Sequence, residues 1–122
     1  MDKAQAIHEF WSGFGIPAYD ENSVPDEAQM PYITYNVATD NFDKMLQLNA
    51  SIWYRSTSWE AISKKADQIS KFIGYGYSLQ KIDDGYLRIV RGQPFAQRMN
   101  DPEDAMVRRM FIILEAEFMT AD

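Results

Sequence analysis

Two hydrophobic periods alternate along the chain and divide it into helices and strands. The first, in which apolar side chains recur every three or four positions, is typical of one face of a helix. It appears near the N-terminus at Ile7, Phe10, Trp11 and Phe14. A helix is therefore predicted from Asp2 to Phe14, with Pro17 beyond its end.

The same period returns in the middle of the chain, directly after a strand. Thr57 and Glu60 have the spacing of a capping box, which predicts that the Thr57 hydroxyl caps a helix there. Gly74 is a favourable residue for ending this helix. Its apolar stripe, which is expected to be buried, contains Trp59, Ile62, Ala66, Ile69 and Ile73.

Alternation of apolar and polar residues predicts the strands, because successive strand residues face opposite sides of a sheet. The turn residues between them are Asp40 to Asp43 and the hairpin signal Asp83-Asp84-Gly85. The predicted strands are Tyr32–Thr39, Lys44–Arg55, Tyr77–Ile82, Tyr86–Arg91 and Val107–Phe118.

Two polar stretches that contain proline, Ala18–Met30 and Gly92–Ala105, are predicted to be long and loosely held loops. The resulting order of elements is α-β-β-α-β-β-β within a single domain of residues 1–122. The predicted fold is α+β, with two helices packed on one face of an antiparallel sheet of four to five strands.

Composition narrows the classes of function. The chain has 18 acidic and 12 basic residues, a net charge of −6, so sequence-independent binding to nucleic acid is disfavoured. It contains no cysteine, which excludes disulfides and thiolate chemistry. No apolar run reaches the length of about 18 residues that a membrane span needs, and the N-terminus does not have the pattern of a signal peptide.

Catalytic chemistry has little support in the sequence. His8 is the only histidine and is expected at the surface of the first helix, so a zinc site or a catalytic triad is not predicted. The short acidic clusters fall where turns are expected. We therefore expect no enzymatic activity, metal or cofactor. The alternatives are a small enzyme or ligand-binding module, and a regulatory protein that binds a basic partner.

A subunit interface is the more favoured kind of site. Trp53 lies on the otherwise polar side of its strand, and the last strand carries Phe111 and Ile113 on its second face. Large uncovered apolar patches on a sheet mark surfaces of association, and such patches are usually bordered by charge. The candidate interface residues are Trp53, Arg55, Arg109, Phe111, Ile113, Glu115 and Glu117.

Three stretches resemble the tail-completion proteins of long-tailed bacteriophages, a group that includes tail terminators, head-to-tail joining proteins and minor capsid proteins. The first is "MPYITYNV" (Met30 to Val37), a strand that opens with Pro-Tyr after an acidic loop. The second is "ASIWYRSTSWEAISKKADQISKFI" (Ala50 to Ile73), a strand passing directly into a helix. The third is "GQPFAQRMNDPEDAMVRRMFIILEAEF" (Gly92 to Phe118), a loop and the final strand.

The resemblance covers roughly residues 31–118 and implies a structural protein of a virion, made in the cytoplasm of a bacterial host. It implies a homo-oligomeric ring of six subunits at the junction of head and tail, in contact with the tail tube and the head-completion proteins. No enzymatic residues, cofactor, membrane contact or sequence-specific contact with nucleic acid follow from it. Other neck or minor capsid proteins, and a small binding module with an acidic surface, remain open as alternatives.

Overall fold

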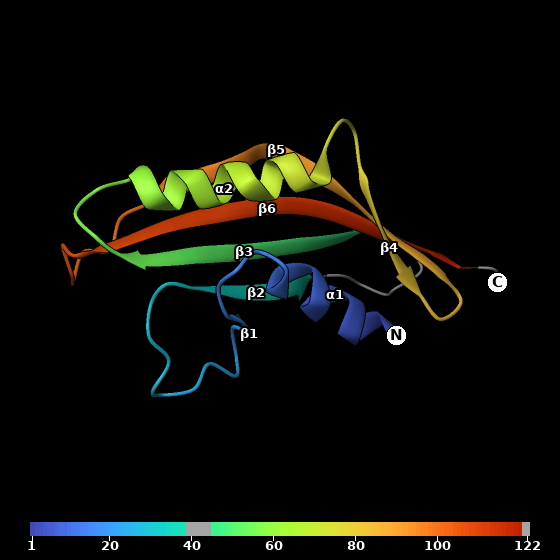
Figure 1. Ribbon diagram of the computed structural model, residues 1–122, viewed down its shortest axis with the longest axis horizontal. Coiled ribbons are helices and arrows are strands. Elements are labelled where there is room, and N and C mark those ends of the chain that lie inside the picture. Colours follow the sequence, from blue (N-terminus) through green and yellow to red (C-terminus); the bar gives the residue numbers. More distant parts are fainter. Residues whose placement is uncertain (39–44, 121–122) are drawn as a thin grey trace.

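The computed structural model describes residues 1–38 and 45–120, which form one sheet and two helices (Figure 1). The order of elements is α-β-β-β-α-β-β-β. The helices are α1 (Lys3–Ser12) and α2 (Glu60–Ile73); the strands are β1 (Ala18–Asp20), β2 (Tyr32–Ala38), β3 (Leu46–Arg55), β4 (Ser78–Ile82), β5 (Gly85–Met99) and β6 (Val107–Thr120).

The sheet has six strands in the order β1-β2-β3-β6-β5-β4. β1 is parallel to β2, and every other neighbouring pair is antiparallel. The predicted fold class was therefore wrong: the sheet is mixed rather than antiparallel, has six strands rather than four to five, and contains a strand that the predicted order lacks.

The arrangement of the helices also differs from the prediction of two helices on one face. α2 contacts β3, β6 and β5, whereas α1 contacts β1 and β4, which are the two edge strands of the sheet. The sheet must therefore curve so that both of its edges approach α1, which gives a half-barrel. Both helices contribute to a single core, whose largest fully buried side chain is Trp11.

The two predicted long loops are partly strand. At the start of the first, the amide of Ile33 donates to the carbonyl of Pro17, and the amide of Glu21 donates to the carbonyl of Tyr35. These bonds hold β1 in place. In the second, β5 continues through a bulge between Arg91 and Ala96 and pairs with β6 as far as Met99. The bulge contains Pro94, whose missing N–H cannot join the ladder.

Several predictions are confirmed. The first helix, the hairpin of β4 and β5 around Asp83 and Asp84, and the long final strand are all present. Gly74 ends α2 with a positive φ of 75°, a conformation that favours glycine. The predicted turn at Asp40–Asp43 lies outside the described residues.

The start of α2 differs from the predicted capping box. The helix begins at Glu60, and its N-cap residue is Trp59, whose side chain makes no capping hydrogen bond. The Glu60 amide instead donates to the Ser58 hydroxyl at 3.0 Å. Because Trp59 lies at the helix boundary, it is only half-buried rather than fully buried as the stripe predicted.

Candidate assembly surface

The seven predicted interface residues all lie on β3 and β6, the two central strands. Alternate residues of β6, from Met110 to Ala116, are buried in the core. The residues between them therefore face the side of the sheet that is turned away from the core, here called the outer face. The structure thus brings these side chains together on one surface, as the sequence predicted, although it does not show what contacts them.

Trp53 and Arg109 pair across β3 and β6 on this surface. The guanidinium carbon of Arg109 lies 4.7 Å from the centre of the Trp53 ring, within the range of a cation–π interaction. Trp53 donates its indole N–H to the hydroxyl of Thr34 at 2.9 Å, and Arg109 donates Nε to the hydroxyl of Ser51 at 2.9 Å. These bonds satisfy two buried hydroxyls and fix both large side chains.

The apolar centre of the outer face consists of Phe111 and Ile113, both half-buried. Phe111 lies between Ser51 on β3 and Gln97 on β5. Ile113 packs closely on the backbone of the β5 bulge, where a Cβ at Gly92 would come within 2.5 Å of its Cγ2 atom. Glycine at this position lets the bulge approach the strand, and the centre of the face is therefore partly covered by the chain itself.

Charged side chains border this centre. Arg55 forms an exposed ion pair with Asp104 at 3.1 Å, and Glu117 forms one with Arg88 at 3.5 Å. Glu115 is exposed and makes no ion pair among the described residues. It is therefore the carboxylate of this face that is most available to a partner.

A second set of exposed apolar side chains, which the sequence did not reveal, runs from the connection between α2 and β4 along the hairpin of β4 and β5 (Figure 1). We call it the hairpin patch. Its large apolar side chains are 43 to 107% exposed: Tyr75, Tyr77, Leu79, Tyr86 and Met119. Met119 continues the alternation of β6 and therefore belongs to the outer face. It was missed from the sequence because the predicted strand ended at Phe118.

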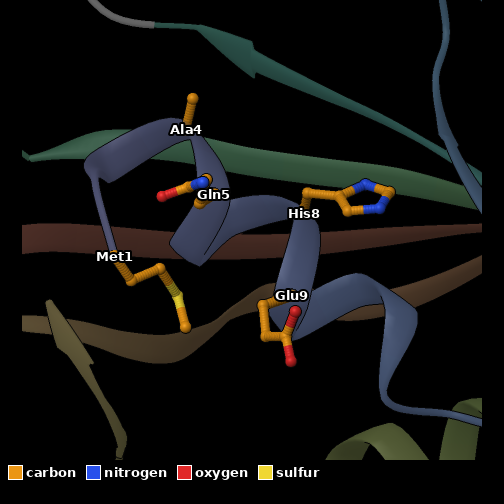
Figure 2. Close-up of a pocket in the computed structure, with 5 residues that line it drawn as sticks. All are labelled: Met1, Ala4, Gln5, His8 and Glu9. Carbon is orange, nitrogen blue, oxygen red and sulfur yellow. The ribbon is translucent and has the colours of Figure 1, made fainter.

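His8 lies on the exposed side of α1, as predicted, beside an open hollow lined by Met1, Ala4, Gln5 and Glu9 (Figure 2). Its Nδ1 lies 2.9 Å from the hydroxyl of Tyr35, and its Nε2 lies 3.2 Å from that of Ser12. The side chains of His8 and Glu9 point in different directions rather than toward a common point (Figure 2). The hollow therefore presents no convergent set of catalytic groups.

Neither described helix is long and apolar enough to cross a membrane. Within residues 1–38 and 45–120, no three His, Cys, Asp or Glu side chains are grouped so as to hold a metal ion.

Comparisons with known proteins found similarity in structure but none in sequence families. No protein-family model matches the chain, and no curated protein matches it. Among solved structures, it is similar to a chain from the virion of a native gene transfer agent particle, with a TM-score of 0.64 and 14% identity. The match covers 95% of this chain and 93% of the other. At this identity the likeness shows that the two chains share a fold.

Proposed function

We propose that this protein is a structural subunit of a bacteriophage-like virion. More specifically, the protein would be a tail terminator or a related tail-completion subunit. Six copies would form a ring at the junction of head and tail. Its partners would be further copies of itself, the tail tube and the head-completion proteins. It would have no enzymatic activity, and no cofactor is part of the proposal.

The observation that carries this proposal is the fold shared with a virion chain over nearly the full length of both. The sequence stretches that resemble phage tail-completion proteins point to the same class independently. They include β2 and the passage from β3 into α2, which adjoin or form parts of the proposed interface.

The outer face of β3 and β6 has the properties of an assembly surface. It combines a half-buried apolar centre at Phe111 and Ile113 with a charged border, the usual anatomy of a protein interface. Trp53 and Arg109 are already fixed by internal bonds, so little side-chain freedom would be lost on association. A contact between this face and a different surface of the next copy would close a ring if the rotation permits.

The oligomeric state tests this proposal. Light scattering at several protein concentrations, with negative-stain microscopy, should show a discrete ring in the presence or absence of tail tubes. Glu115→Lys should shift the protein toward monomer, because it reverses an exposed charge on the interface. Glu9→Lys, which makes the same change at an exposed position of α1, on the core side of the sheet, is the matched control.

Two outcomes would count against parts of this proposal. A strictly monomeric protein at high concentration, with and without tail tubes, would contradict the ring. Oligomers that respond equally to Glu115→Lys and Glu9→Lys would retain the ring but exclude the outer face as its interface.

A further inference from the structure

β4 is an edge strand of the sheet and pairs on one side only, with β5. Leu79 and Lys81, on either side of its central residue, are exposed, and the exposed fraction of Leu79 is 47%. Edge strands carry a row of backbone N–H and C=O groups that can pair with another chain.

The hydrogen-bond alternation of the hairpin identifies the free groups. In an antiparallel pair, residues that bond across the ladder alternate with residues whose groups point away from it. Asp83 belongs to the second kind, because its amide donates to the carbonyl of Met1 rather than to β5. Lys81 and Leu79 lie two and four positions before Asp83. Their N–H and C=O groups therefore also point to the free edge.

The chain's own N-terminus already uses the last position of this edge. Met1 accepts the Asp83 amide, and its terminal ammonium forms an ion pair with the Asp83 carboxylate. Among the described residues, no other backbone bond is made at the outer side of Lys81 or Leu79. The edge thus has one position filled and two adjacent positions open.

The side chains around the open positions define the chemistry of a partner. Leu79 lies beside Tyr77 in the exposed hairpin patch, on the face away from the core. The Lys81 ammonium lies 5.2 Å from the centre of the Tyr86 ring and has no ion pair within the described part of the chain. Cross-strand pairs of opposite charge, or of two apolar residues, stabilise strand association.

We propose that the β4 edge is a docking site for an extended segment of another protein, added as a further strand. The segment would carry an apolar residue opposite Leu79 and, two positions away, an acidic residue opposite Lys81. This mode of recognition takes affinity from backbone hydrogen bonds and specificity from alternate side chains. The inference does not depend on the proposed ring, because the ring's interface lies on β3 and β6.

A second copy of β4 is a poorer partner for this edge. Antiparallel pairing about Gln80 would place each Leu79 opposite a Lys81 and would bring no anion to either lysine. The other edge strand, β1, is only three residues long and is buried at Ala18, so it offers a shorter edge. The observed side chains therefore favour an acidic strand from a different chain.

A designed heptapeptide tests the proposal on the whole protein. Acetyl-Thr-Glu-Thr-Val-Thr-Glu-Thr-amide sets glutamate opposite Lys81 and valine opposite Leu79 whichever way it runs. The measurement is amide hydrogen exchange by NMR, with increasing peptide. At a peptide concentration of twice the dissociation constant, exchange at the Leu79 and Lys81 amides should slow about threefold. The control peptide replaces both glutamates with lysine and should give no protection.

Two variants make the result specific. Lys81→Glu should reverse the preference, so that the lysine peptide protects the edge and the glutamate peptide does not. Leu79→Pro removes an outward N–H that the ladder does not use, and should weaken protection while leaving the hairpin paired. The proposal is overturned if millimolar glutamate peptide leaves both amides unchanged, if both peptides protect equally, or if protection appears away from β4.

Discussion

Arg91 on β5 closes the C-terminal end of α2 by donating Nη2 to the carbonyl of Gly74 at 2.6 Å. The same nitrogen donates to the carbonyl of Ser70, also at 2.6 Å, and Nε donates to the Ser70 hydroxyl at 2.8 Å. The Ser70 carbonyl also accepts the Gly74 amide at 3.1 Å, so the arginine adds a second donor there and supplies one to the Gly74 carbonyl. It also places a positive charge at the negative end of the helix dipole. This contact fixes α2 over the sheet.

Removing this cap should destabilise the protein more than removing a surface arginine. Arg91→Met should lower the free energy of unfolding by about 1.5–3 kcal/mol, because it removes three hydrogen bonds from a charged group and leaves the half-buried carbonyl of Gly74 without this donor. Arg55→Met, which removes an exposed ion pair, should cost no more than about 1 kcal/mol. Urea denaturation of both variants measures the difference, and equal losses would refute the role assigned to Arg91.

The three tryptophans provide a second test, because their environments differ. Trp11 is fully buried, so Trp11→Ala should cost about 3–5 kcal/mol through the cavity it leaves. Trp59 is half-buried, and the guanidinium groups of Arg98 and Arg108 lie 4.8 and 5.4 Å from its ring centre. Trp59→Ala should therefore cost only about 1–2 kcal/mol, from partial burial and exposed cation–π contacts. Thermal melts in which the Trp59 variant loses more than the Trp11 variant would contradict this order.

Trp59 shows that the sequence predicted the presence of a helix more accurately than the residue at which the helix begins. The spacing from Ile62 to Ile73 identifies α2 correctly, because a buried helical face requires that period. The start of the helix depends on which hydroxyl meets which amide, and Thr57 and Ser58 differ in position by a single residue. The spacing of Thr57 and Glu60 fits a capping box. In the structure, however, it is the hydroxyl of Ser58 that accepts the Glu60 amide.

This difference predicts unequal effects on stability for two neighbouring substitutions. Ser58→Ala should lower stability by about 0.5–2 kcal/mol, because its hydroxyl accepts the Glu60 amide. Thr57→Ala should have little effect, since the Thr57 contact with Arg108 is made by its backbone carbonyl. Melting temperatures of the two variants distinguish the cap seen in the structure from the one predicted from sequence.

The strands of the sheet differ in how well the sequence pattern predicted them. Alternation identified β2, β3 and β6 and placed the outer-face residues correctly relative to the core, because each of these strands has one buried face. β1 is only three residues long, too short for alternation to be recognised, and it forms by pairing with β2. The hairpin patch was missed because exposed aromatic residues in a short strand look the same in sequence as buried ones.

The ion pair at the end of the outer face predicts a specific dependence on acid. The amide of Met106, and then Arg55, lower the pKa of the Asp104 carboxyl below its ordinary value of 3.8. A lowered pKa in the folded state gives stabilisation that is complete above the unfolded value and is lost as the pH falls through the folded value. Asp104→Asn should therefore reduce the fall in melting temperature below about pH 4. Asp26→Asn, in the other acidic loop, is the control, and equal pH profiles for wild type and Asp104→Asn would contradict the assignment.

Hydrogen exchange distinguishes the strand-rich structure from the long loops that the sequence predicted. The segment from Ala96 to Met99 pairs with β6, so its ladder amides should exchange at rates close to those of β6. Between Asn22 and Met30, by contrast, few backbone bonds are made, among them the bond from Ala28 to the carbonyl of Pro25. Those amides should exchange orders of magnitude faster in a monomeric sample, because local opening there breaks little structure. Peptide-resolved exchange measured by mass spectrometry gives both rates in one experiment. Fast exchange over Ala96–Met99 would show that the second half of β5 is a loop after all, and slow exchange over 22–30 would show that this loop is held by contacts beyond those of the single chain.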